Sequence, residues 1–87
     1  MIFHISFEYT PDNRDKVHER FKETGAPPPD GVTMTGRWHS AAGNRGFLVA
    51  EAEGAEPIAR WLQEWTELVS FEVVPVLTDA EFRNVVA

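Results

Sequence analysis

The chain contains no cysteine among its 87 residues, so disulfide bonds cannot contribute to its stability. It also lacks the residue spacing of a metal site and has no glycine-rich phosphate loop. A domain this short buries only roughly 60 to 65% of its unfolded surface, so it needs another source of stability. We expect one domain over residues 1–87, no cofactor or metal, and stabilisation by homodimer formation.

Basic residues are scarce, with 8 Lys and Arg against 14 Asp and Glu, which gives a net charge of −6. The field of such a protein repels phosphate backbones, which argues against a nucleic-acid partner. Long apolar runs are missing as well. His4 and Glu8 interrupt residues 2–9, which also lack a basic leader, so we expect neither a signal peptide nor a membrane span. The default expectation is a cytoplasmic protein without a membrane partner.

Aromatic residues, in contrast, are plentiful: the chain has three Trp, six Phe and one Tyr. Side chains of this kind dominate both hydrophobic cores and protein interfaces. Their number in so short a chain supports the expected homodimer.

The first half of the chain begins with a strand and a helix. Residues 2–9 alternate between apolar and polar side chains with a period of two, which predicts a strand. Thr10 and Pro11 then provide an N-cap hydroxyl and a proline at the first helical position, and Gly25 ends the predicted helix over 11–24. The apolar stripe of this helix is thin, so we expect it to cover the sheet loosely.

The remaining segments predict a hairpin, a second helix and a last strand. Residues 32–40 and 46–53 are extended runs around a turn-rich AAGNR. The second helix is expected from Pro57 to about Val69, where apolar residues recur at intervals of three and four. Residues 71–78 follow as a β-branched strand that contains Pro75. Since proline cannot donate to a strand ladder, this strand belongs at a sheet edge.

This order is the βαββαβ pattern of an α+β ferredoxin-like sandwich with a four-stranded antiparallel sheet. Its first and third strands are central and its fourth is at an edge, in agreement with the position of Pro75. Both helices lie on one face, and the last strand is apolar on both of its sides, so the bare face of the sheet carries an apolar patch. Two such faces packed together would form a dimeric α+β barrel. Residues 78–81 match a capping box and predict a terminal helix against the partner subunit.

The region from Ile58 to Leu77, with its WLQEWTELVSFEVVPVL run, resembles short bacterial proteins grouped as domain-of-unknown-function family 3303. Further anchors of the pattern are Phe3, the ERF of residues 19–21, the PDG of residues 29–31, Trp38 and Glu51. The resemblance implies a dimeric α+β barrel of ferredoxin-like topology, and it implies no particular activity.

Glu51 is the candidate catalytic residue. If Trp38 pairs with Val49, Gly36 lies opposite Glu51, and the acid shares a face with Met34 and Trp38. A carboxyl group in apolar surroundings has a raised pKa and can act as a general acid or base. The alternative is an acid at a strand end that is solvated or paired with an arginine.

Three apolar residues, Trp38, Met34 and Trp65, are the candidate ligand-binding residues. Aromatic walls suit flat organic ligands in a pocket between sheet and helices. The helical spacing of Trp61 and Trp65 favours a place in the core for Trp65, whereas Gly36 leaves room beside Trp38.

The three histidines form no metal triad with the acids. His4 lies on a polar stripe of the first strand, where interface hydrogen bonding is its expected use. His18 is expected to be a solvated helix residue, and His39 is expected with Arg37 on the other face of the sheet.

Two classes of function remain. In one, the protein is a small dimeric α+β barrel that binds or converts an aromatic or polyketide-like molecule without a cofactor. In the other, it is a non-catalytic dimerisation or interaction protein. A pocket of a few hundred cubic ångströms containing Glu51 favours the first class, and a closed core with a solvated or salt-bridged Glu51 favours the second.

Overall fold

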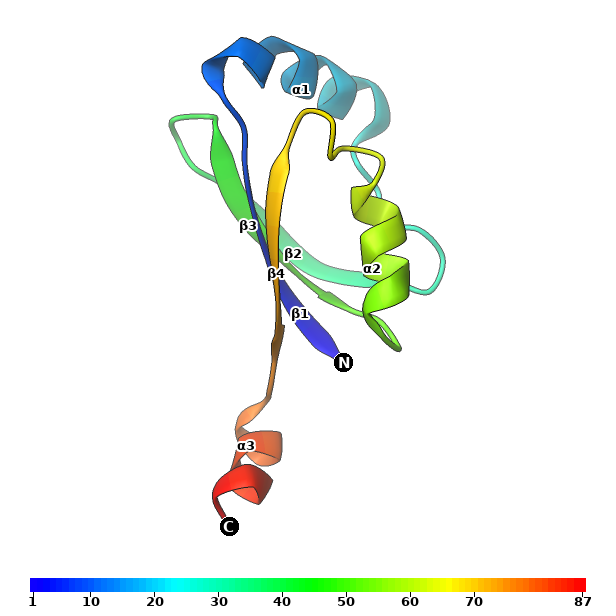
Figure 1. Cartoon of the computed structure of the whole chain (residues 1–87), viewed down its shortest axis with the longest axis vertical. Coiled ribbons are helices and arrows are strands. Elements are labelled where there is room, and N and C mark those ends of the chain that lie inside the picture. The colour runs from blue at the N-terminus through cyan, green and yellow to red at the C-terminus, as the bar shows by residue number, and fades with distance from the viewer.

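Seven helices and strands follow one another in the computed structural model, which describes all of residues 1–87. The strands are β1 (Ile2–Glu8), β2 (Thr33–His39), β3 (Arg45–Glu51) and β4 (Ser70–Val76). The helices are α1 (Pro11–Thr24), α2 (Ala55–Leu62) and α3 (Asp79–Val86). Up to β4 this is the predicted βαββαβ order, so the α+β ferredoxin-like fold is confirmed (Figure 1).

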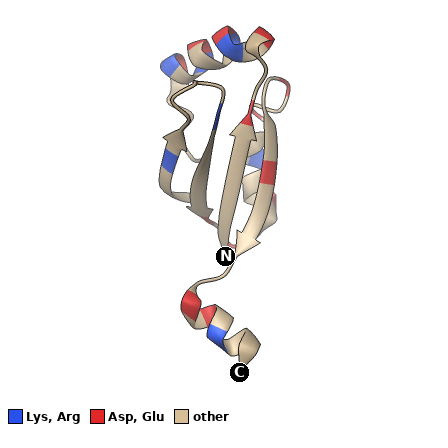
Figure 2. Ribbon diagram, turned by 90° about the vertical axis from the view of Figure 1, so that its left-hand side faces the viewer, with Lys and Arg blue, Asp and Glu red and all other residues tan.

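The strands form one four-stranded antiparallel sheet in the order β2-β3-β1-β4. β1 and β3 are central and β4 is at an edge, as Pro75 requires. α1 lies across one end of the sheet, α2 lies against one face, and α3 projects beyond the opposite end (Figure 1). The other face of the sheet, which we call the helix-free face, has no helix over it (Figure 2).

The pairing of β2 with β3 differs from the prediction. Trp38 pairs with Phe47 instead of Val49, a slip of two residues that leaves its face unchanged. A β-bulge between Met34 and Gly36 then shifts the register once more. The bulge puts Met34 opposite the buried Ala50, on the face that the helices cover. The expected sharing of one face by Met34 and Trp38 is therefore wrong.

The core lies between the sheet and the helices. One cluster joins the inward side chains of β1 and β3 to α2, and includes Phe3, Ile5, Leu48, Ile58 and Trp61. A smaller cluster joins α1 to the segment that follows α2, and consists of Val17, Trp65 and Val69. Val17 is the only buried residue of α1, which agrees with the loose cover that its thin apolar stripe predicts.

The second helix is shorter at its end than expected. It begins at Ala55, so Pro57 occupies the first turn, where no backbone N–H needs a partner within the helix. After Leu62 the chain continues in turns, in which the amides of Glu64 and Trp65 bond to carbonyls three residues back. Trp65 and Val69 are nevertheless buried, so the apolar spacing predicted the packing but not the helix end.

The terminal helix forms where the capping box predicts it. The Thr78 hydroxyl accepts from the Glu81 amide at 3.2 Å, and the Glu81 carboxylate accepts from the Thr78 amide at 2.9 Å. These bonds lower the pKa of Glu81. None of the residues of α3 is buried, since the helix extends away from the sheet (Figure 1).

Candidate functional site

A largely apolar cavity of about 370 Å³ lies between the sheet and the helices. β1 and β4 contribute Phe7 and Phe71, α1 contributes Phe21, and Trp61 and Trp65 come from α2 and the turns after it. The cavity exists because α1 covers the sheet with a single buried side chain and leaves space beside it. It is a pocket with aromatic walls, of the kind expected between sheet and helices.

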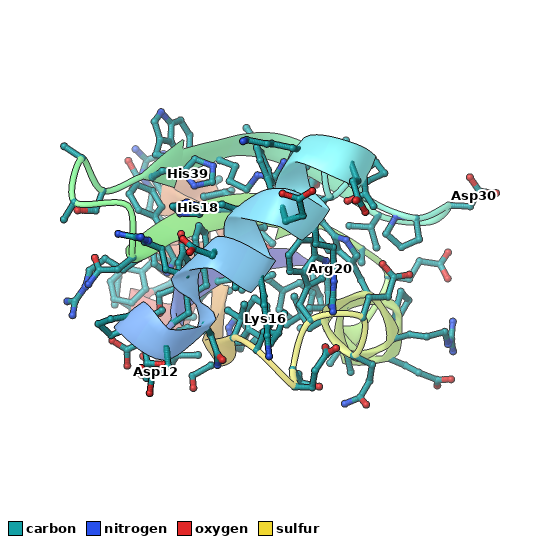
Figure 3. The ribbon with its side chains drawn as sticks, turned by 90° about the horizontal axis from the view of Figure 1, so that it is seen from above. Asp12, Lys16, His18, Arg20, Asp30 and His39 are labelled. Carbon is teal, nitrogen blue, oxygen red and sulfur yellow. The ribbon has the colours of Figure 1, made fainter.

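Four nitrogen-bearing side chains lie at the edge of this cavity. They are His18 and Lys22 from α1, and Arg37 and His39 from β2. Arg37 and His39 are two residues apart on one strand, so both point to the helix side, as the sequence predicts. His18 and His39 lie beside each other between α1 and the sheet (Figure 3).

His18 belongs to a hydrogen-bonded cluster with Tyr9 and the hairpin that joins β2 to β3. The Tyr9 hydroxyl donates to the Gly43 carbonyl at 2.8 Å and lies 3.0 Å from His18 Nε2. The same nitrogen is 3.0 Å from the Gly43 oxygen. Burial raises the pKa of Tyr9, which keeps its hydroxyl protonated as a donor. The expectation that His18 is a solvated helix residue is therefore wrong, because it ties α1 to the hairpin.

His39 has aromatic neighbours and no hydrogen-bond partner. Its ring packs edge to face against the rings of Phe7 and Phe21, at centroid distances of 5.6 and 5.3 Å. Burial, together with the charges of Arg37 and His18, lowers the pKa of His39. The lowered pKa favours the neutral imidazole, which can accept a proton or a hydrogen bond from a molecule in the cavity.

Arg37 holds the turn after α1. Its terminal nitrogens donate to the carbonyls of Gly25 and Ala26 at 2.9 and 2.8 Å, and its guanidinium lies 5.0 Å from the centre of the Phe21 ring. Gly25 and Ala26 both have positive φ, at 72° and 44°, a conformation that alanine rarely adopts. Arg37 thus stabilises a strained turn, and burial lowers its own pKa.

Arg20 closes the opposite side of the same region (Figure 3). It forms a bidentate pair with Glu67 at 3.0 and 2.7 Å, donates to the Glu64 carbonyl at 2.6 Å, and lies 5.2 Å from the centre of the Trp65 ring. The hydrogen bonds to Arg20 lower the pKa of Glu67. Arg20 therefore fastens α1 to the turns that carry Trp65.

The helix-free face carries an aromatic stack whose residues line a second hollow, of about 610 Å³, together with polar side chains such as Ser6, Glu8 and Glu72. The rings of His4, Phe47 and Trp38 follow one another across β1, β3 and β2, at centroid distances of 5.2 and 5.1 Å. The Trp38 indole lies over Gly36, where an added Cβ would be 2.5 Å from its ring. Figure 2 shows that few positions along the four strands are charged residues.

The structure separates the residues that the sequence suggested as one site. Trp65 lines the cavity, and Met34 packs against the larger core cluster on the same side of the sheet. Trp38 and Glu51 lie on the helix-free face, and Glu51 is exposed and takes part in no ion pair. Glu51 was expected in apolar surroundings, whereas it is exposed and does not line this cavity.

Sequence reasoning missed the convergence of Tyr9, His18, Arg37 and His39. The position of His18 was one signal of it. His18 is next to Val17 and so lies beside the apolar stripe of α1 that faces the sheet. No three side chains of His, Asp and Glu gather closely enough to hold a metal ion. None of the three helices has the length and hydrophobicity of a membrane-spanning segment.

Comparisons with known proteins bear on the fold and the family. The solved structure of Rv0793 from Mycobacterium tuberculosis is similar, with a TM-score of 0.53 and 18% sequence identity, over 91% of this chain and 97% of that chain. At this identity the likeness shows the fold alone. No curated protein matches the chain. The family described as Domain of unknown function (DUF3303) matches residues 1–87, so the chain belongs to that family, as the run from Ile58 to Leu77 predicts.

Proposed function

We propose that the protein is a homodimer that binds a small, flat organic molecule in the cavity of each subunit, without a cofactor. The observation that carries the proposal is the cavity of about 370 Å³ with its aromatic walls. Ligand pockets in proteins typically enclose about 300 to 1,000 Å³ and combine apolar walls with a few polar groups. The rings of Phe21, Trp61 and Trp65 suit a planar aromatic or polyketide-like molecule.

Proton transfer in this cavity would be carried out by His39. Its ring nitrogens have no partner in the protein, and its lowered pKa favours the neutral imidazole, which is the form that accepts a proton. Glu51 remains a proposal for catalysis on the helix-free face alone, because it does not line the cavity. The sequence linked the enzyme or binder class to a pocket that contains Glu51. A cavity is present, but Glu51 lies outside it.

The homodimer is supported by exposed apolar side chains on the helix-free face. Trp38 is 51% exposed and Phe47 is 40% exposed, and Val74 and Val76 of β4 add to the same patch. Exposed apolar patches of this kind mark interaction surfaces. A second copy of the chain offers the same patch, and two sheets packed face to face would bury both.

The projecting helix α3 supports a second copy as the partner. Its residues Phe82, Val85 and Val86 are largely exposed, and Val85 is 65% exposed. An isolated helix of 8 residues is unstable in water, even with a capping box. Contact with the partner subunit would supply the packing that α3 lacks in a single chain.

Calorimetric titration with two probes of the same ring system, 1-naphthoate and 1-naphthalenemethanol, tests the binding proposal. We expect at least one probe to bind with one molecule per chain. Phe21→Trp adds bulk at the cavity wall and should weaken that binding, whereas Phe82→Trp makes the same change on α3 and should not. The absence of binding by both probes, or equal binding by the two variants, would refute the cavity as a ligand site.

A non-catalytic interaction protein is the second candidate. The exposed, unpaired state of Glu51 and the large apolar patch on the helix-free face favour it. It predicts a dimer that binds neither naphthalene probe, and the same titration therefore separates the two candidates.

A further inference from the structure

The charged groups around the cavity are all of one sign. Of its 16 lining residues, Lys22 and Arg37 are cationic and His18 and His39 are titratable bases, and none is Asp or Glu. The chain as a whole has the opposite bias, with 14 acids against 8 Lys and Arg. The absence of acids at this one hollow runs against the composition of the chain, and it makes the edge of the cavity electropositive.

Arg37 has no carboxylate partner. The four ion pairs of the structure use Arg14, Arg20, Arg45 and Arg60. A guanidinium has five N–H donors, and the two that reach the Gly25 and Ala26 carbonyls leave three without an acceptor in the protein. Partly buried charges are usually paired, so an unpaired one beside an apolar cavity is a candidate recognition group.

His39 adds a second free hydrogen-bonding group on the same strand. Neither of its ring nitrogens is bonded, and its ring lies between Phe7 and Phe21, which both line the cavity. A neutral imidazole can donate one N–H to an anion and still accept at its other nitrogen. Arg37 and His39 therefore place free hydrogen-bonding groups at the edge of an otherwise aromatic hollow.

We propose that the cavity selects an aromatic carboxylate, with the rings of the ligand among Phe21, Trp61 and Trp65 and its carboxylate at Arg37. This inference rests on the proposed function, and it adds the charge and the orientation of the ligand. Carboxylates and guanidinium groups form paired, charge-assisted hydrogen bonds, which an alcohol of the same size cannot match. The purely structural role of Arg37, which is to hold the turn after α1, uses only two of its donors.

The ratio of the two dissociation constants tests the inference independently of binding itself. With hydrogen bonds to charged groups contributing about 1.5 to 3 kcal/mol, 1-naphthoate should bind about tenfold to a hundredfold more tightly than 1-naphthalenemethanol. Arg37→Met should remove most of this preference while retaining the alcohol, and Arg37→Lys should restore part of it. The matched control Arg60→Met, which removes a cation from the exposed surface of α2, should leave the ratio unchanged.

These measurements distinguish an anion preference at Arg37 from a purely structural role of Arg37 and from the absence of ligand binding. Tight binding of both probes with equal affinity refutes the anion preference and leaves the binding function standing, whereas failure of both probes refutes the binding function too. A parallel loss of both affinities in Arg37→Met, with the ratio intact, assigns Arg37 a structural role only. A loss of preference confined to the Arg37 variants supports the proposal.

Discussion

Phe47 provides the sharpest test of the homodimer, because it lies in the middle of the aromatic stack on the helix-free face. In one chain it is 40% exposed, which for a side chain of about 200 Å² leaves roughly 80 Å² to be covered by a partner. At about 25 cal/mol per Å² this area contributes about 2 kcal/mol. The two copies of Phe47 in a symmetric dimer would together contribute about 4 kcal/mol, so Phe47→Ala should raise the dimer dissociation constant about a thousandfold.

Sedimentation equilibrium over a range of protein concentrations measures this constant. Phe21→Ala is the matched control, since Phe21 is 36% exposed but lies on the helix side of the sheet. It should leave the dimer intact, and urea unfolding of both variants should show that each is folded. A Phe47→Ala protein that associates as tightly as the unmodified chain, or an unmodified chain that is monomeric at micromolar concentration, would refute the proposed interface.

Two further predictions concern the attachment of α1 and the charge of His39. Arg20→Met should lower the urea midpoint more than Arg14→Met, because Arg20 joins α1 to the turns after α2 whereas Arg14 pairs only with its neighbour in sequence. The difference between the two variants should shrink in acid, as the pH falls through the lowered pKa of Glu67, the carboxylate that Arg20 binds. A similar loss in both variants would show that the Arg20 contacts do not stabilise the domain. For His39 the folded-state pKa lies below the ordinary value of 6.5, so its neutral form favours folding above that pH and the advantage is lost as the pH falls through the folded pKa. The stability of the unmodified chain should therefore decline relative to His39→Gln between pH 7.5 and pH 5, and parallel urea midpoints across that range would contradict the lowered pKa.

The order of strands and helices was predictable because each rests on a local pattern. The alternation of residues 2–9 predicts β1, and Pro75 predicts that β4 is at an edge. The capping box at Thr78 likewise predicts α3. These features depend on neighbours in sequence or on the chemistry of one residue, and they are confirmed.

The register of β2 was not predictable in the same way. A β-bulge is selected by how both flanks of a strand pack, and Gly36, which directly follows Thr35, is a local signal that permits a bulge without fixing the register. The missed bulge put Met34 on the face of Trp38 and Glu51. Those two residues do share a face, but the cavity lies on the other side of the sheet.

The cavity itself depends on residues that are distant in sequence. Tyr9, His18 and Gly43 come from three separate segments, and their hydrogen bonds exist only once α1 has crossed the end of the sheet. The sequence predicted correctly that Arg37 and His39 lie opposite the polar stripe of β1. It did not show that α1 would leave space above them, because a thin apolar stripe predicts weak cover without saying where the space remains.

The single extra residue at the β2 bulge divides this strand into two parts with different roles. Before Thr35, Met34 turns inward to the core, and after it, Arg37 turns inward to the cavity while Trp38 turns outward. Removing that residue would exchange the two sides of the strand on one flank of the bulge. On the 36–39 flank, an arginine would be carried to the open face and an indole into the cavity. Insertions in the hairpin at 40–44 would not exchange these sides, so natural variants of this domain are expected to preserve the length of β2 together with Arg37 and His39.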